Sequence, residues 1–177
     1  MLFNYGNALK IGSLAPDFAL ADENGNLWRL SEKRGKVVLL LFYPANETLV
    51  CTKQLCSLRD NWDIYRSTQS EIVAVSSSTA EANRRFSEKY QLPIRILSDS
   101  ERVVTRLFAA HPIFPVSFMR SIAVIDAAGK IRAHQTMLRI FRPDDHDVIL
   151  ALYAAKSEVF DEQRRQLRSR IRKILLG

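Results

Sequence analysis

The two cysteines of the chain, Cys51 and Cys56, both lie in the stretch LFYPANETLVCTKQLCSLRD, residues 41–60. Such thiols can form a structural disulfide, bind a metal, or act as a nucleophile with a partner. A tetrahedral zinc site needs four Cys or His ligands at close, characteristic spacings. The three histidines are His111, His134 and His146. None is paired at ligand spacing, so the sequence argues against a metal site, and we expect no cofactor.

The spacing of the two thiols also bears on a disulfide. On a regular helix, residues five positions apart are separated by a rise of about 7.5 Å and an angle of about 140°, which puts their Cα atoms roughly 8.6 Å apart. A disulfide needs Cα atoms within about 6.8 Å of each other. Cys51 and Cys56 therefore cannot bond while a helix that carries both stays regular, and a bond requires part of it to unwind.

The third possibility is a nucleophile at the start of a helix. Cys51 follows a buried strand and a short loop, and the unpaired N–H groups of a first helical turn stabilise a thiolate. The alternative is a small, inert, buried side chain, which is how most free cysteines behave. Position alone does not decide between a reactive and an inert Cys51.

The elements that would position these residues alternate between strands and helices. A continuous apolar run at 36–44 predicts a strand buried on both faces of a sheet. Apolar residues spaced by three and four predict a helix from about Leu49 to Arg66. We expect further strands at 26–30, 71–77 and 94–99, helices at 79–91, capped by Thr79, at 100–110 and from Asp144 onward, and two strands within 120–137 joined at Ala128-Gly129. This order predicts an α/β fold with a mixed central sheet flanked by helices.

Composition points to an ordinary globular protein. The chain has 177 residues, of which 47% are hydrophobic and 25% charged. We find no apolar run of membrane-spanning length and no secretory signal at the start, and so expect reduced thiols and a cytoplasmic location. The net charge of +7 is uneven, because residues 161–177 contribute +4 of it.

Four separated positions resemble a known family. Pro44, Thr48 and Cys51 stand as P-x-x-x-T-x-x-C, which is similar to the active-site signature of the peroxiredoxins. The segments APDFAL, RGKVVLLLFYP and CSLRD agree, and MRSIAVIDAAGKI resembles the segment that carries the family's active-site arginine, here Arg120. A second cysteine five residues after the first is similar to the Q-type subfamily, also called bacterioferritin comigratory proteins. The resemblance covers roughly residues 10–137.

The resemblance implies a thioredoxin-like fold and a thiol peroxidase that reduces hydrogen peroxide and organic hydroperoxides. Cys51 would attack the peroxide and become a sulfenic acid. Cys56 would resolve it as an intramolecular disulfide, and thioredoxin or a glutaredoxin-like dithiol donor would reduce that disulfide. Arg120 would favour the thiolate and polarise the peroxide, and Thr48 would orient the peroxide. Pro44 would fix the loop and shield the sulfur from water.

Each of these residues also has a purely structural interpretation. Thr48 could be only a helix cap, Pro44 only a strand terminator, and Arg120 only a solvated strand end. Their occurrence together, in family order, favours the catalytic interpretation. Arg139 and Arg142 are rivals for the second positive group. The chain departs from the family in LV at 49–50, where a proline is common, and in the segment HPIFPVSFM before Arg120.

The C-terminal part lies outside the resemblance. We expect a peroxiredoxin domain at 1–143 and a basic helical segment at 144–177 that packs on the same domain or extends it. Its arginines surround an apolar stripe, which fits a helix packed on the domain, a dimer contact, or a contact with an acidic partner, nucleic acid or an anionic membrane surface. No aromatic residues are interleaved with the charges, which weakens the nucleic-acid interpretation. We expect a monomer or a homodimer.

Two other functions compete with a peroxidase. A thioredoxin-fold redox sensor or binding module would switch its cysteine pair with little turnover. A basic interaction protein would carry the thiols incidentally. Steady peroxide consumption separates the peroxidase from the sensor.

Overall fold

A five-stranded mixed sheet forms the centre of the computed structural model, which describes residues 9–110 and 113–157. The strands lie in the order β5-β4-β3-β6-β7. Their bounds are β3 (Val38–Tyr43), β4 (Glu71–Ser76), β5 (Arg95–Ser98), β6 (Met119–Ile125) and β7 (Ile131–Leu138). The β3–β4 and β4–β5 pairs are parallel, whereas β3–β6 and β6–β7 are antiparallel. The expected α/β fold with a mixed central sheet is thereby confirmed.

The central strand β3 is buried at every position, as its apolar run predicted. Because successive side chains of a strand point to opposite faces, Leu39, Leu41 and Tyr43 belong to one core cluster and Leu40 and Phe42 to another. The first cluster also contains Cys51. One face of the sheet is therefore the face against which Cys51 packs.

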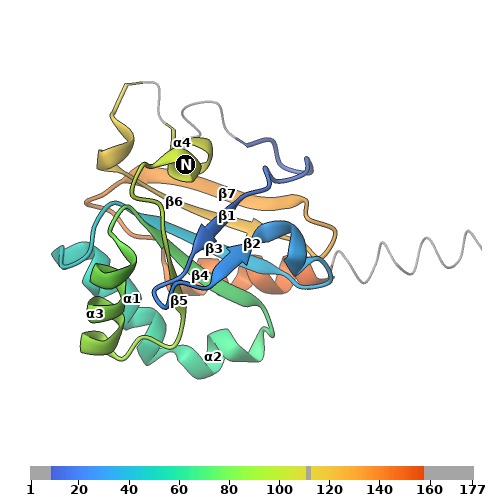
Figure 1. Cartoon of the computed structure of the whole chain (residues 1–177). Helices are drawn as coiled ribbons and strands as arrows, with labels where there is room; N and C mark the ends of the chain where they lie inside the picture. Colours follow the sequence, from blue (N-terminus) through green and yellow to red (C-terminus); the bar gives the residue numbers. More distant parts are fainter. Residues whose placement is uncertain (1–8, 111–112, 158–177) are drawn as a thin grey trace, which may run out of the picture.

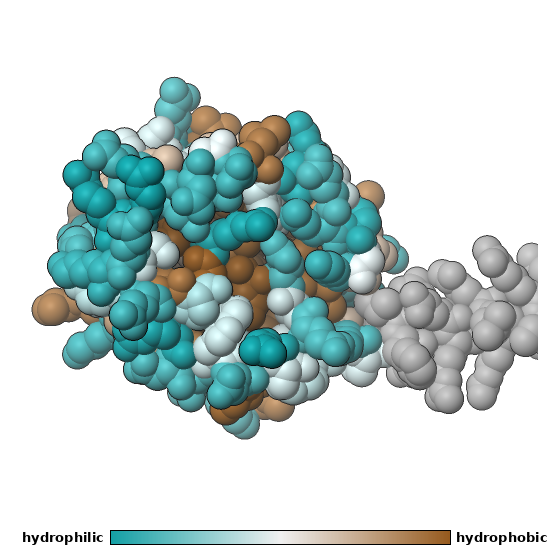
Figure 2. Space-filling view, turned by 60° about the horizontal axis from the view of Figure 1, so that its bottom comes forward, coloured by the Kyte–Doolittle hydropathy of each residue, from teal (hydrophilic) through white to brown (hydrophobic). Residues whose placement is uncertain are grey.

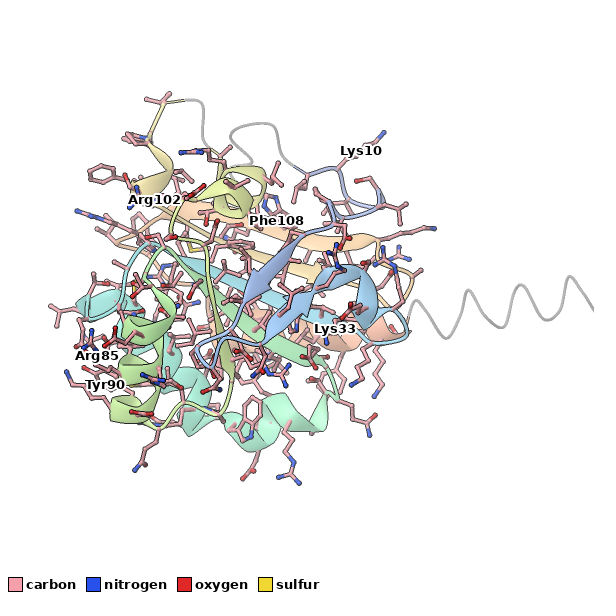
Figure 3. The ribbon with its side chains drawn as sticks, in the orientation of Figure 1. Lys10, Lys33, Arg85, Tyr90, Arg102 and Phe108 are labelled. Atoms are coloured by element: carbon pink, nitrogen blue, oxygen red, sulfur yellow. The ribbon has the colours of Figure 1, made fainter. Side chains whose placement is uncertain are left out.

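Helices and a small hairpin cover these two faces (Figure 1). The bounds of the other elements are β1 (Ala19–Ala21), β2 (Leu27–Arg29), η1 (Leu30–Lys33), α1 (Leu49–Asp60), α2 (Trp62–Ser67), α3 (Ala80–Tyr90), α4 (Val103–Ala109) and η2 (Val116–Phe118). A further helix runs over residues 145–157. Side chains of α1, α2, α3 and this last helix enter the first cluster, whereas those of α4 and β2 enter the second. Phe108 of α4 (Figure 3) stacks on Phe42, with ring centroids 4.9 Å apart.

The helix expected from Leu49 to Arg66 is interrupted, so that prediction was wrong at Asn61. Asn61 has φ −101° and ψ 20°, outside the helical region, and separates α1 from α2. Its side chain donates to the carbonyl oxygen of Ser57 at 3.0 Å. Asparagine competes in this way with the regular helical pattern, and a break here gives α2 its own direction.

The turn between β6 and β7 agrees with its prediction. Gly129 has φ +81°, a conformation that glycine adopts without steric cost. Its N–H donates to the carbonyl oxygen of Asp126 at 2.8 Å. The antiparallel pairing of β6 with β3 places Arg120, near the start of β6, beside the end of β3.

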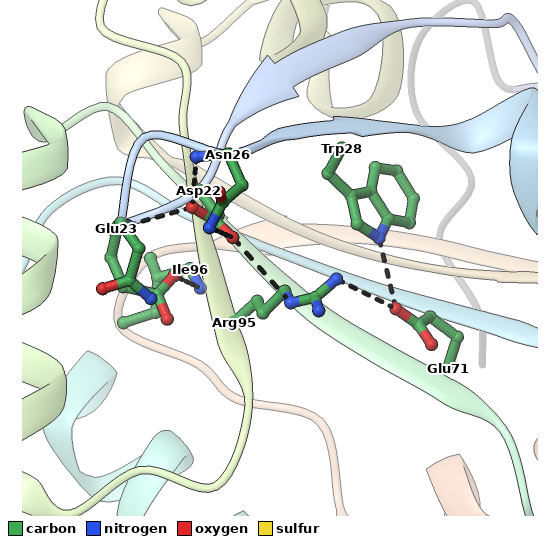
Figure 4. A network of polar contacts seen from close by, with 8 residues as sticks. Asp22, Glu23, Asn26, Trp28, Glu71, Arg95 and Ile96 are labelled. Carbon is green, nitrogen blue, oxygen red and sulfur yellow. Dashed lines mark hydrogen bonds and ion pairs between the residues drawn. The ribbon is translucent and has the colours of Figure 1, made fainter.

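The hairpin β1–β2 is tied to the edge of the sheet by polar contacts (Figure 4). Glu23 accepts a hydrogen bond from the backbone N–H of Ile96 on β5 at 2.9 Å. Arg95 lies between the carboxylates of Asp22 and Glu71, at 3.8 and 3.9 Å. Unpaired N–H groups on an edge strand invite pairing with other chains, so this hairpin protects the β5 edge.

The face of the molecule shown in Figure 2 is mostly hydrophilic. On the face shown in Figure 2, apolar side chains gather mainly in a central hollow, with a few others at the periphery. None of the helices within residues 9–110 and 113–157 combines the length and the hydropathy of a membrane span. Of the basic helical segment expected at 144–177, residues 145–157 form a helix, whereas residues 158–177 lie outside the described residues. The boundary at 143/144 remains a prediction.

His134 on β7 is expected to make stability depend on pH. Its Nε2 lies 2.7 Å from the carbonyl oxygen of Phe108, so Nε2 carries a hydrogen, and Nδ1 has no partner among the described residues. Burial lowers the pKa of His134 below the ordinary value of 6.5. The unfolded chain then binds the extra proton more readily, and stability falls as the pH drops below 6.5. His134→Gln keeps a donor to Phe108 but does not titrate. The difference between the denaturant midpoints at pH 7 and pH 5 should therefore be smaller in this variant than in the wild type. An equal difference in the two proteins would contradict the prediction.

Candidate active site

Cys51 lies in the first turn of α1, at the carboxyl end of β3. Thr48 is the N-cap residue of α1, and its hydroxyl oxygen accepts a hydrogen bond from the Cys51 N–H at 3.4 Å. Thr48 therefore does cap the helix, as its purely structural interpretation proposed. This contact uses the oxygen as an acceptor, which leaves the hydroxyl hydrogen able to donate to another group. Cys51 itself is only 1% exposed.

Arg120 meets Cys51 from the neighbouring strand. Its Nη2 donates to the Cys51 Sγ at 3.0 Å, across 69 positions of sequence. Arg120 is fully buried, and its Nε and Nη1 have no hydrogen-bond partner in the described part of the chain. Buried polar groups are nearly always satisfied. A buried guanidinium with two unused donors beside a thiol is suited to an incoming ligand that can accept hydrogen bonds.

The electrostatics of this pair follow from burial and mutual charge. Burial lowers the pKa of Arg120, and the negative charge of a Cys51 thiolate opposes that change. Tyr43, at the end of β3, is also buried, and burial raises the pKa of its phenol so that it stays protonated at neutral pH. A negative charge on the sulfur of Cys51 would compensate the buried guanidinium.

A partly buried polar network holds the loop between β3 and α1. The Tyr43 hydroxyl donates to Asn46 at 2.8 Å, and the Asn46 amide donates to Asn83 of α3 at 2.9 Å. Asn83 is fully buried and also bonds with Ser76 and Ser98, each at 2.9 Å. Nothing in local spacing links positions 43, 46 and 83, so no signal in the sequence indicated these residues.

Two further contacts fix the same loop from outside. The carbonyl oxygen of Pro44 accepts from the Ser77 hydroxyl at 2.5 Å, which ties the loop to the end of β4. Glu47, with φ 60°, forms an ion pair with Lys89 at 2.9 Å and accepts from Tyr90 of α3 at 3.2 Å. The loop that presents Cys51 is therefore held at both its start and its end.

The other sequence candidates make different contacts. Cys56 lies in the same helix α1 and is half-buried, and both thiols are free. Arg139 stacks on Phe118, with its Cζ 4.5 Å from the ring centroid, and Arg142 pairs with Asp145 at 3.8 Å. Of the three arginines considered, Arg120 is the one that donates to Cys51. Among the described residues, no group of three His, Cys, Asp or Glu side chains could hold a metal ion.

Comparison with known proteins shows which family the chain resembles. The AhpC/TSA family model matches residues 11–134. Peroxiredoxin Q, chloroplastic, of Triticum aestivum is 35% identical over 136 residues, 76% of this chain and 62% of that protein. The protein of the same name from Sedum lineare is 34% identical over 76% of this chain and 72% of its own length. The chain thus spans less than two thirds of the wheat relative.

Solved structures agree with these sequence relatives. Peroxidoxin BcpB from Mycobacterium tuberculosis has a TM-score of 0.68 at 28% identity, over 84% of this chain and 97% of that one. Peroxiredoxin Q from Xanthomonas campestris has a TM-score of 0.67 at 19% identity, over 77% and 90%, and supports the fold alone. With its mixed sheet, helix-start cysteine and thioredoxin-like architecture, the chain belongs to the AhpC/TSA family, in its peroxiredoxin Q branch.

Proposed function

We propose that this protein is a thiol peroxidase that reduces hydrogen peroxide and organic hydroperoxides through Cys51. The observation that carries the proposal is the contact between Cys51 and Arg120: a buried guanidinium donates one hydrogen bond to the sulfur at 3.0 Å and keeps two donors unused. These donors match the oxygens of a hydroperoxide, which accept hydrogen bonds and gain negative charge as the O–O bond breaks.

In the proposed reaction, the Cys51 thiolate attacks one peroxide oxygen, the O–O bond breaks, and an S–O bond forms. Cys51 becomes a sulfenic acid, and the second oxygen leaves with a proton as water or an alcohol. Arg120 stabilises the thiolate before attack and the developing charge during it. The Thr48 hydroxyl donates to the peroxide and orients it, while Pro44 contributes no N–H and fixes the loop.

Cys56 completes the proposed cycle. Its thiol displaces the sulfenic oxygen of Cys51 as water and forms an intramolecular disulfide. Both cysteines lie in α1, and the Cα separation of about 8.6 Å on a regular helix exceeds the disulfide limit of about 6.8 Å. The helix must therefore open locally before Cys56 can reach Cys51.

A dithiol donor then restores the thiols by exchange, with thioredoxin or a glutaredoxin-like protein as the proposed reductant. The plant relatives are named as chloroplastic, and a cytoplasmic location for this chain remains a prediction. So do a monomeric or homodimeric state and the division into a domain at 1–143 with a C-terminal segment at 144–177.

Mass spectrometry after one equivalent of peroxide tests the proposed function. We expect the intact mass to fall by two hydrogens, both free thiols to disappear, and peptide mapping to join Cys51 to Cys56 within one chain. Excess peroxide with a thioredoxin system should then be consumed over many turnovers. A protein that oxidises once without turnover would be a redox sensor, and intermolecular links alone would exclude Cys56 as the resolving cysteine.

Thr48→Val should slow the reaction of Cys51 with peroxide by up to about 100-fold, because it removes the donor that orients the substrate. Stopped-flow measurement of sulfenic acid formation reports this rate. Thr48→Ser keeps the hydroxyl and should react nearly as fast as the wild type.

The variant also removes a helix cap, which costs about 1 kcal/mol of stability. Thr79→Val is the matched control, since Thr79 caps α3 by accepting from the Ala82 N–H. It should lose similar stability with no change in rate. Equal rates in Thr48→Val and Thr79→Val would show that Thr48 is only a cap.

A further inference from the structure

The carboxylate of Asp145 joins three helices on the face of the sheet that carries Cys51. Asp145 lies in the first turn of the helix over residues 145–157. One of its oxygens accepts from the Ser57 hydroxyl of α1, and the other accepts from the Tyr65 hydroxyl of α2 at 2.7 Å. This helix lies on the same side of the sheet as α1 and α2 (Figure 1).

The surroundings make these hydrogen bonds strong. The Asp145 side chain is 20% exposed, and Tyr65 is 2% exposed. A hydrogen bond to an ionised carboxylate is roughly twice as strong as one between neutral groups, and a carboxylate in the first turn of a helix is favoured by the helix dipole. Arg142, 3.8 Å away, adds a positive charge.

The hydrogen bond from Ser57 to Asp145 is made next to the second cysteine. Ser57 directly follows Cys56, in the second half of α1. The apolar side chains of this half, Leu55 and Leu58, pack in the same core cluster as Val148 and Leu152 of the helix over 145–157. If this half of α1 unwinds, Ser57 must leave Asp145.

We propose that Asp145 is a positioning residue that holds the Cys56 half of α1 closed through Ser57, and thereby sets how fast Cys56 resolves oxidised Cys51. This inference rests on the proposed function. A stronger hydrogen bond from Ser57 to Asp145 slows the unwinding of α1 and so lengthens the lifetime of the Cys51 sulfenic acid. A second peroxide can then oxidise it to sulfinic acid, with loss of water or an alcohol from the peroxide. Asp145 thus governs the partition between resolution and overoxidation.

Two measurements on the full-length protein test the inference. Hydrogen exchange of the reduced protein should show the amides of residues 55–60 exchanging about tenfold faster in Ser57→Ala and Asp145→Asn, as expected from the loss of one hydrogen bond to a charged group. After one equivalent of peroxide, quenched mass spectrometry should show disulfide formation accelerated by about the same factor. Sulfenic acid formation on Cys51 should keep its wild-type rate.

The chain offers matched controls for both substitutions. Ser67→Ala removes a different hydroxyl contact between α2 and the same helix, the one to Tyr153 at 2.8 Å. Asp144→Asn removes the neighbouring negative charge, whose carboxylate accepts from the His146 N–H. Neither control should change exchange in α1 or the disulfide rate, and Ser57→Thr, which keeps a hydroxyl, should return both toward the wild type.

The outcomes separate this inference from the function on which it rests. If the wild type forms no Cys51–Cys56 disulfide, the resolving role of Cys56 fails, and the inference fails with it. If the wild type forms the disulfide and both Ser57→Ala and Asp145→Asn form it at the same rate, the inference alone is overturned. A rise confined to these two variants, accompanied by less sulfinic acid at high peroxide, supports it.

Discussion

Cys51→Ser is expected to abolish peroxide turnover, with a loss on the order of 10⁴-fold or more, as in other enzymes that lose their nucleophile. A serine hydroxyl does not ionise in the neutral range where a thiol does, and it cannot form a sulfenic acid. Arg120 would then lose the sulfur that accepts its hydrogen bond at 3.0 Å. Peroxide consumption with a thioredoxin system, corrected for the uncatalysed background, measures the effect.

Cys56→Ser is the control for this prediction. It should still reduce one equivalent of peroxide at the wild-type rate and should stop at the sulfenic acid, because no second thiol is available in the chain. Activity retained in Cys51→Ser would refute the assignment of the nucleophile. Activity lost equally in both variants during the first turnover would place Cys56 in the oxidation step, contrary to the proposal.

The fold was largely predictable from local patterns. The apolar run at 36–44 indicated a strand buried on both faces, and β3 (Val38–Tyr43) is buried at every position. Thr79 caps α3 as expected, and Gly129 forms the predicted turn. These features depend on side-chain periodicity and turn chemistry, which a few neighbouring residues determine. The break at Asn61 was missed because apolar spacing continues across it.

The meeting of Arg120 with Cys51 could not be predicted from spacing. The two residues are 69 positions apart, and only the resemblance to the peroxiredoxins associated them. The antiparallel pairing of β3 with β6 supplies the physical reason, because Phe42 lies opposite Ser121 and the next position brings Arg120 beside the end of β3. Register between distant strands is a property of the folded sheet.

Polar contacts between distant elements were the least predictable part. Asn83 reaches Asn46 from α3, and Asp145 reaches Ser57 across 88 positions. In the sequence, each of these residues is typical of an exposed, solvated position. Their roles follow only from the packing that brings distant elements together, so only the structure reveals the residues that hold the Cys51 loop and α1.

Arg120→Met should slow the oxidation of Cys51 by about 10² to 10³, the usual effect of removing one donor that stabilises a developing negative charge. Methionine fills a comparable apolar volume without a charge. Because Arg120 is fully buried with two donors unpartnered among the described residues, its replacement should leave stability unchanged or raise it. Stopped-flow sulfenic acid formation and a denaturant midpoint on the same variant measure both effects.

A lower oxidation rate without a loss of stability in Arg120→Met would indicate a chemical role of Arg120 and not a structural one. A residue needed only for packing would lose both together. Arg120→Lys keeps the charge and loses the planar fork of donors, so we expect it to recover part of the rate but not all of it. Arg139→Met is the matched control, because Arg139 stacks on Phe118 instead of bonding to the sulfur. If Arg139→Met slowed the oxidation as much as Arg120→Met, the charge near the loop, and not the contact with Cys51, would be what the reaction requires.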